Sequence, residues 1–156
     1  MRIEKAAIED LKAICGWFKT GADVQLWGGP SLAFPLELEE VKKAIEWSDS
    51  NSYSFFNEKN RLIGFAQVFD KFGCQHLSRI VLTPELRGKG ISCELLKLLI
   101  DSIDSVQDCY SLFVYEHNMS ALKLYKRLGF ARHKYPDGVE NNEGCIFMVR
   151  GAITLQ

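Results

Sequence analysis

The sequence predicts a mixed α/β domain (α+β in its layout), with a central sheet of about seven strands and about four helices. Three observations support this fold class. Short runs rich in β-branched and aromatic residues are bounded by turn residues, and apolar residues elsewhere recur at three- and four-residue steps. A strand–helix–strand–helix order in the middle of the chain implies local parallel pairing. At 156 residues, 47% hydrophobic and 25% charged, residues 1–156 are expected to form one globular domain.

The first third of the chain predicts a short strand and two helices. Residues 1–5 are the candidate strand. Apolar residues at helical spacing indicate the first amphipathic helix: Ile8, Leu11, Cys15 and Phe18. The segment 21–34 carries glycine and proline and is expected to be a loop. Pro35 suits the first turn of the second helix, whose buried stripe is Leu38, Val41 and Ile45.

The middle of the chain predicts three strands. Residues 52–56 and 61–69 are β-rich runs separated by the polar stretch NEKN, which indicates a hairpin. A third run, residues 75–82, ends at Thr83-Pro84, because proline cannot donate to a strand ladder.

The last third predicts two helices and three strands. A helix is expected from about Ile91 to Ile103, followed by a buried strand at 109–115. A short helix at about 119–128 ends at Gly129, because glycine adopts the left-handed conformation that often ends helices. Residues from Phe130 onward and 144–152 are expected to form a closing pair of strands.

Charge and cysteine content narrow the class of protein. The formal net charge of −1 gives no general attraction to nucleic acids or anionic membranes, so neither is an expected partner. The five cysteines have no CxxC spacing, so each is expected to be a free core residue in a reducing, cytoplasmic compartment, and no metal site is predicted. The charged N-terminus and short apolar runs predict neither a signal peptide nor a membrane span. A homodimer is left open.

The stretch RGKGIS, residues 87–92, is a candidate anion site. It lies between a predicted strand and a predicted helix, so free N–H groups of the first helical turn point into the loop. Gly88 and Gly90 carry no side chain that would block a ligand, and Arg87 and Lys89 add positive charge. Neither a Walker A loop nor a complete Rossmann fingerprint is present. A plain turn with solvated cations is the alternative.

The segment RIVLTPELRGKGISCELLKLLI resembles the acetyl-CoA-binding motif of the GNAT superfamily of N-acetyltransferases. The family pattern, Gln/Arg-x-x-Gly-x-Gly/Ala, maps onto Arg87, Gly90 and Ser92, and Ser92 departs from the usual Gly or Ala. A second family motif is similar to VYEHNMSALKLYKRLGF, with Asn118, Ala121 and Tyr125 in place. The resemblance covers nearly the whole chain. It implies a GNAT-like fold whose two central parallel strands splay to admit CoA.

The resemblance also implies a set of cofactor contacts. Acetyl-CoA is the expected acyl donor, held by main-chain groups and by the charges of the glycine loop. The expected cofactor-binding residues are Ile80, Val81, Leu82, Arg87, Gly88, Lys89, Gly90, Ile91, Ser92 and Asn118. Asn118 has a second interpretation as the N-cap of the following helix, and the two roles are compatible.

Catalytic roles follow from the same resemblance. Tyr125 matches the family's usual general acid, since a phenol is protonated at neutral pH and can donate to the departing sulfur; core packing is its alternative. His76 is the candidate base, acting through a water, because it shares a strand face with the cofactor contacts; a purely structural histidine is its alternative. Other family members use a glutamate on the next strand, where this chain has Phe113. Glu116 is a weaker candidate.

The acceptor is the least specified part of the prediction. Trp27 and Phe34 are candidate substrate-binding residues in a loop that often walls the family's acceptor site; sealing the first helices against the sheet is the alternative. Asp137 belongs to an acidic loop that is either an attractor for a cationic amine or simply solvated. A small-molecule amine is the expected acceptor. Acetylation of a protein N-terminus or lysine, and a non-catalytic acyl-CoA-binding module, are the alternative functions.

Overall fold

The computed structural model describes residues 1–103 and 105–153, and these residues contain seven strands and five α-helices. The strands are β1 (Arg2–Lys5), β2 (Ser52–Phe56), β3 (Leu62–Lys71), β4 (Cys74–Leu82), β5 (Cys109–Tyr115), β6 (Ala131–His133) and β7 (Cys145–Gly151). The helices are α1 (Ile8–Cys15), α2 (Gly21–Gly28), α3 (Leu38–Ala44), α4 (Ile91–Ser102) and α5 (Met119–Arg127), with a short 3₁₀ turn at Pro84–Leu86. The strand order β1-β2-β3-β4-β5-β7-β6 confirms the predicted mixed sheet.

The chain divides into two compact units. The first comprises Met1–Gln67 and Arg79–Ser102, and the second comprises Val68–Ser78 and the chain from Ile103 onward. Strands β3 and β4 therefore contribute residues to both. The prediction of a single domain over 1–156 stays a prediction.

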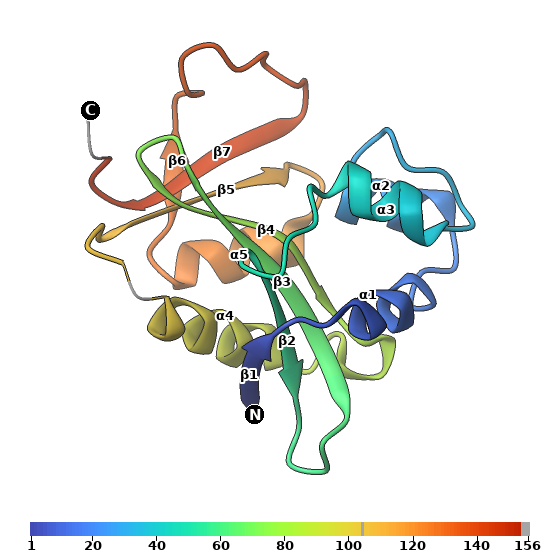
Figure 1. The fold of residues 1–156 in the computed structure, drawn as a ribbon. Helices are drawn as coiled ribbons and strands as arrows, with labels where there is room; N and C mark the ends of the chain where they lie inside the picture. The colour runs from blue at the N-terminus through green and yellow to red at the C-terminus, as the bar shows by residue number, and fades with distance from the viewer. Residues whose placement is uncertain (104, 154–156) are drawn as a thin grey trace. The chain divides into compact units, whose positions relative to one another are not determined.

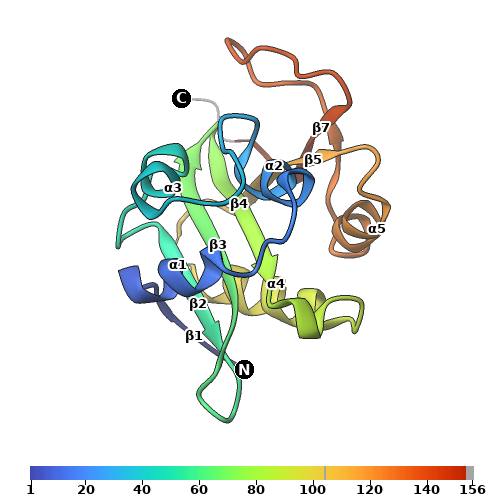
Figure 2. The same ribbon diagram turned by 90° about the vertical axis from the view of Figure 1, so that its right-hand side faces the viewer.

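The first unit contains three antiparallel strands. Ile3 of β1 lies opposite Phe55 of β2, and Tyr53 of β2 lies opposite Ala66 of β3. Figure 2 shows these strands running side by side. The β2–β3 pairing confirms the hairpin that the two β-rich runs and the polar NEKN stretch predict.

The helices of the first unit lie on two faces of its strands, as two consecutive residues of β3 show. Phe65 packs into a core cluster formed with α1, α2 and α3, whereas a Cβ at Gly64 would lie 2.5 Å from Leu95 of α4. Successive side chains of a strand point to opposite faces, so α4 covers the face opposite the other three helices (Figure 1). The buried members of the cluster are Ala6, Leu11, Ile14, Phe18, Val24, Trp27, Leu32, Val41, Ile45 and Phe65.

Helix α2 corrects the prediction of a loop over residues 21–34. Thr20 is its N-cap, and the Thr20 hydroxyl accepts a hydrogen bond from the backbone N–H of Asp23 at 3.1 Å. This Thr-x-x-Asp signal is visible in the sequence. The glycines at both ends of the segment obscured it, although Gly21 and Gly28 lie at the helix limits and Gly29 follows at φ 93°.

The second unit is built on β5, β7 and β6. Strand β7 lies between its neighbours and pairs antiparallel with both, with Leu112 and Arg132 each opposite Met148. The first residues of β4 pair parallel with β5, where Gln75 lies opposite Tyr110. This pairing confirms the parallel strands that the strand–helix–strand order predicts. The sequence also predicts that β4 and β5 splay apart further along. The residues concerned belong to different units, and the splay stays a prediction.

A disulfide in the second unit overturns the expectation that all five cysteines are free. Cys74 and Cys109 begin the parallel strands β4 and β5, lie 4.7 Å apart at Cα, and are bonded through sulfur. Both are fully buried beside Phe147 and Val149. Their 35-residue separation in sequence concealed a contact that exists only because β4 and β5 are neighbours. Cys15, Cys93 and Cys145 are free, as expected.

Candidate acetyl-CoA site

The glycine loop lies exposed between β4 and α4. Gly88 and Gly90 have φ angles of 75° and 77°, a region that other L-residues adopt only at a cost. A Cβ at either position would meet nothing within 4 Å, so the space over both backbones is open. The two glycines are therefore explained by the backbone turn that leads into α4, and they leave the loop accessible to a ligand.

Charge reinforces the anion-binding character of this loop. Lys89 is exposed, and α4 begins directly afterwards at Ile91 and runs for 12 residues. The first N–H groups of an α-helix lack partners within the helix and carry partial positive charge. The Nε of Arg87 donates to the carbonyl of Leu82 at 3.2 Å, which attaches the guanidinium to the end of β4. The loop thus combines fixed donors with two cationic side chains, a combination that suits a phosphate group.

The predicted main-chain contacts lie on the last residues of β4. Ile80 and Val81 are partly buried and Leu82 is buried. The strand is continued by a bond from the Thr83 N–H to the carbonyl of Ile63 on β3, at 2.9 Å. One edge of this strand is therefore held by β3, and the role of Ile80–Leu82 toward a ligand stays a prediction.

The two predicted acceptor residues have different environments. Trp27 is 7% exposed, packs against Phe18 in a tilted arrangement with ring centroids 4.8 Å apart, and donates its indole N–H to the carbonyl of Arg79 at 2.8 Å. Phe34 is 46% exposed. Trp27 is thus fixed within the core of the first unit, as the sealing interpretation proposes, while Phe34 remains available to a solute.

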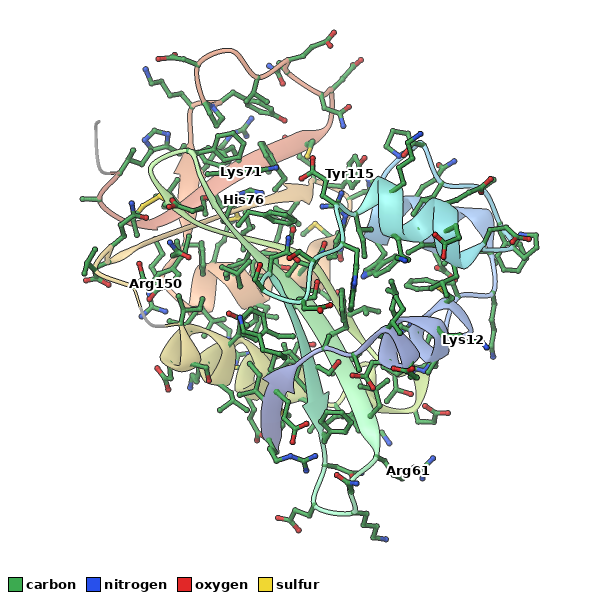
Figure 3. All side chains as sticks on the ribbon, viewed as in Figure 1. Lys12, Arg61, Lys71, His76, Tyr115 and Arg150 are labelled. Atoms are coloured by element: carbon green, nitrogen blue, oxygen red, sulfur yellow. A yellow bond between two sulfur atoms is a disulfide. The ribbon has the colours of Figure 1, made fainter. Side chains whose placement is uncertain are left out.

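His76 is buried within a cluster of rings in the second unit (Figure 3). Its Nδ1 lies 2.8 Å from the hydroxyl of Ser111 on β5. Its ring centroid lies 5.0 Å from Phe72, 5.2 Å from Phe113 and 6.4 Å from Phe147. These contacts give His76 a structural role of its own, and its role as a base stays a prediction.

Tyr125 is buried on α5, and burial raises the pKa of its phenol to about 12. Its ring lies 6.0 Å from that of Phe130, whose N–H donates to the Tyr125 carbonyl at 3.0 Å. Gly129, at φ 92°, makes this chain reversal after α5. The phenol therefore keeps its proton throughout the neutral range. With its pKa raised in this way, the phenol is suited to donate a hydrogen bond and not to transfer its proton completely.

Asn118 occupies the N-cap position of α5 without capping it through its side chain. Its carbonyl oxygen accepts from the Leu122 N–H at 3.0 Å, while its side-chain oxygen accepts from the Ser120 hydroxyl at 3.4 Å. The side-chain cap that the sequence allowed is therefore not formed. Contact with CoA remains the predicted role of this amide.

The predicted site residues fall in both units. The first contains Trp27, Phe34, Ile80–Leu82 and the loop Arg87–Ser92, and the second contains His76, Asn118 and Tyr125. Among the described residues, no three His, Cys, Asp or Glu side chains are grouped as metal ligands would be. No helix within 1–103 and 105–153 has the length and apolar character needed to cross a bilayer.

An open depression of about 700 Å³ in the second unit was not predicted. It lies beside the turn that joins β3 to β4, where Phe72 and Gly73 both have positive φ. Tyr135 lines it and donates its hydroxyl to the carbonyl of Cys145 and, at 3.2 Å, to that of Asn142. Asp137 of the predicted acidic loop also lines it, so that loop borders a depression while remaining exposed to solvent.

The chain belongs to the GNAT acetyltransferase family. The family model for the acetyltransferase (GNAT) domain matches residues 33–149, which include both of the motifs that the sequence presents.

The spermine/spermidine N(1)-acetyltransferase of Bacillus subtilis strain 168 is 30% identical over 79 residues. The match covers 44% of this chain and 52% of that protein, so the chain spans about half the length of the curated relatives it matches. Two solved structures share its fold. One is spermidine N-acetyltransferase from Vibrio cholerae in complex with CoA and spermine, with a TM-score of 0.71, 18% identity, and coverage of 95% of this chain and 93% of that one. The other is a domain from Methanocaldococcus jannaschii, with a TM-score of 0.74, 18% identity, and coverage of 95% and 96%.

Proposed function

We propose that residues 1–156 act as one GNAT domain that transfers an acetyl group from acetyl-CoA to a primary amine of a small molecule. The observation that carries the proposal is the exposed loop Arg87–Gly90, which is open over both glycines and leads directly into α4. In a chain of this family, such a loop fits the diphosphate of CoA.

The chain's own groups supply the binding of the donor. Backbone N–H groups from Gly88 to Ser92 hold the diphosphate, and Arg87 and Lys89 neutralise its charge. Main-chain groups of Ile80–Leu82 bind the pantetheine arm, with Asn118 as a further contact. The reaction needs no other cofactor, because the thioester already carries the activated acetyl group.

Direct transfer requires one bond to form and one to break. The neutral amine nitrogen attacks the thioester carbonyl carbon, a C–N bond forms, and the C–S bond then breaks with its electron pair going to sulfur. The amine loses a proton to His76 through a water, and Tyr125 donates a hydrogen bond to the departing sulfur. Because burial raises the pKa of Tyr125 to about 12, the phenol stabilises the thiolate without ionising itself.

A small polyamine is the first acceptor class to test. The Bacillus subtilis relative is named for spermine and spermidine, and this chain is 30% identical to it over 79 residues. Phe34 is exposed and can contact an alkyl chain, whereas Trp27, the second predicted acceptor residue, is buried. Diamines and simple arylalkylamines complete the panel, because the sequence specifies an amine but not its length.

A thiol-release assay with acetyl-CoA tests the proposal. We expect turnover with at least one amine of the panel and a rise in Tm when acetyl-CoA is added, since a ligand that binds only the folded state stabilises it. Acetylation of peptides alone would assign the protein to N-terminal or lysine acetylation. A Tm shift without turnover would favour a non-catalytic acyl-CoA-binding module, and no shift at saturating acetyl-CoA would refute the anion site.

A further inference from the structure

Strand β4 contains a residue in the left-handed region at Arg79, with φ of 52°. A long-chain L-residue adopts this conformation at a cost of about 1–2 kcal/mol and keeps it only where its surroundings hold it. A single such residue within a strand bends the strand and redirects the groups that follow. The groups that follow Arg79 are Ile80, Val81 and Leu82.

The carbonyl of Arg79 is held by Trp27. The indole Nε1 of Trp27 donates to this oxygen at 2.8 Å, so the carbonyl is directed toward α2. The indole is itself fixed, because its ring lies 4.8 Å from Phe18 and 6.2 Å from Phe65. The hydrogen bond from the Trp27 indole therefore anchors the bend to the core of the first unit.

The side chain of Arg79 adds a second attachment. Its Nη2 donates to the carbonyl of Ala44 at 3.4 Å, at the C-terminal end of α3, where helix carbonyls favour a cation. Burial lowers the pKa of Arg79, and the charge of Glu46 opposes that shift. The negative charge of Glu46 thus partly offsets the cost of burying the guanidinium beside α3. The bend is held by Trp27 of α2 and by the end of α3.

We propose that Trp27 and Arg79 are positioning residues for the donor: they hold the bend that directs the main chain of Ile80–Leu82 toward the pantetheine arm and thioester of acetyl-CoA. This role rests on the proposed function. It gives Trp27 of α2 a role toward the donor, whereas the sequence alone suggested either an acceptor contact or a residue that seals the first helices against the sheet. Trp27 acts through the Arg79 carbonyl and does not itself touch the reacting atoms.

The first test removes the indole donor and keeps an aromatic ring. Trp27→Phe is expected to weaken acetyl-CoA binding about fivefold, the effect of losing one hydrogen bond. The matched control is Trp47→Phe, because Trp47 packs on the same Phe65 ring, 6.3 Å between centroids, and is partly buried against the same core cluster. This control is expected to change Tm by a similar amount and to leave acetyl-CoA affinity unchanged. Faster amide exchange at Ile80–Leu82 is expected in Trp27→Phe alone.

The second test separates the bend from the charge. Arg79→Gly and Arg79→Ala both remove the guanidinium, but only glycine adopts a φ of 52° without strain. We therefore expect Arg79→Gly to bind acetyl-CoA several-fold more tightly than Arg79→Ala, although glycine is the more flexible residue in a strand.

The outcomes distinguish this proposal from the proposed function. If wild-type protein does not bind acetyl-CoA in calorimetry, both fail together. If wild-type protein binds, then unchanged affinity in Trp27→Phe, or equal affinities in the two Arg79 variants, overturns the positioning role alone. In the transfer reaction, Trp27→Phe is expected to raise KM for acetyl-CoA and leave KM for the amine unchanged. The reverse pattern would make Trp27 an acceptor contact and would also overturn the positioning role.

Discussion

His76 and Ser111 face each other across the parallel strands β4 and β5, with Nδ1 of the imidazole 2.8 Å from the serine hydroxyl. The pair lies within the hydrogen-bonded register that begins next to the Cys74–Cys109 disulfide. A buried polar pair of this kind stabilises the strand pairing, because losing the bond between the two would leave each buried polar group with one hydrogen bond fewer.

The first prediction concerns the two roles of His76. His76→Ala is expected to lower the free energy of unfolding by about 2–4 kcal/mol, since it removes the bond to Ser111 and the ring contacts. If His76 is also the base, the same variant flattens the acidic limb of the pH–rate profile. Urea unfolding and the pH–rate profile measure the two effects separately. An acidic limb that survives in the variant would leave His76 with the structural role only.

Glu116→Gln is the control for this experiment, because Glu116 is the other candidate base. Its carboxylate is exposed and lies 3.5 Å from Arg132, a surface ion pair. The substitution is expected to change the free energy of unfolding by less than about 0.5 kcal/mol. Loss of the acidic limb here, and not in His76→Ala, would transfer the role of base to Glu116.

The second prediction concerns Tyr125 in turnover. Tyr125→Phe removes the proposed donor to sulfur and keeps the ring beside Phe130, 6.0 Å away. Turnover is expected to fall by about 10²-fold or more, while acetyl-CoA affinity changes by less than about twofold. Steady-state kinetics and calorimetry on the same preparation check this. Unchanged turnover would place Tyr125 in the core packing alone.

The third prediction follows from the raised pKa of Tyr125, about 12 against an ordinary value of 10. Below pH 10 the phenol is protonated in both the folded and the unfolded chain, so ionisation of Tyr125 does not lower the free energy of unfolding there. Between pH 10 and 12 the unfolded chain releases this proton and the folded chain retains it, which favours unfolding. The free energy of unfolding is expected to fall by roughly 2–3 kcal/mol over that interval.

The measurement is a comparison of urea unfolding at pH 9 and near pH 12 in wild-type protein and in Tyr125→Phe. The difference between the two proteins isolates Tyr125 from Tyr135, whose pKa partial burial also raises to about 12. Equal losses of stability in both proteins would show that Tyr125 ionises in the folded state as freely as in the unfolded chain.

The fourth prediction tests the glycine loop against a matched turn. Gly90 and Gly138 have φ angles of 77° and 79°, and a Cβ at either would meet nothing within 4 Å. Alanine at either position is therefore expected to cost about 1–2 kcal/mol of strain. Only Gly90→Ala is expected to weaken acetyl-CoA binding, because only that loop precedes α4. Equal binding by the two variants would count against the diphosphate site.

The fifth prediction concerns the cysteines. Protein unfolded without reductant is expected to show three reactive thiols, from Cys15, Cys93 and Cys145, and five after reduction. Reduction is expected to lower the free energy of unfolding by about 3–4 kcal/mol, given the 35-residue separation of Cys74 and Cys109. Because disulfides are rare in reducing compartments, five thiols without reductant would instead agree with the predicted cytoplasmic location.

Most of the fold was predictable because it depends on local pattern. Strand 109–115 has the limits that its apolar run indicates, and α4 begins directly after the glycine loop. The sequence does not predict helix α2, although Thr20 and Asp23 carry a capping signal, because glycine disfavours helices and is frequent in loops. Two helices and the glycine loop also carry motifs that identify the family, and the match to residues 33–149 confirms it.

Periodicity, proline and glycine positions, and two short motifs were enough to predict most of the elements and the family, since each depends on residues close together in the chain. The order of those elements, strand–helix–strand, implied the parallel pair. The bend at Arg79, the indole of Trp27 on its carbonyl, the His76–Ser111 bond and the Cys74–Cys109 disulfide were decided only by the tertiary structure. The reason is physical: each joins segments 35 or more residues apart, or needs its surroundings to hold an unfavourable backbone conformation, and no local pattern encodes either condition.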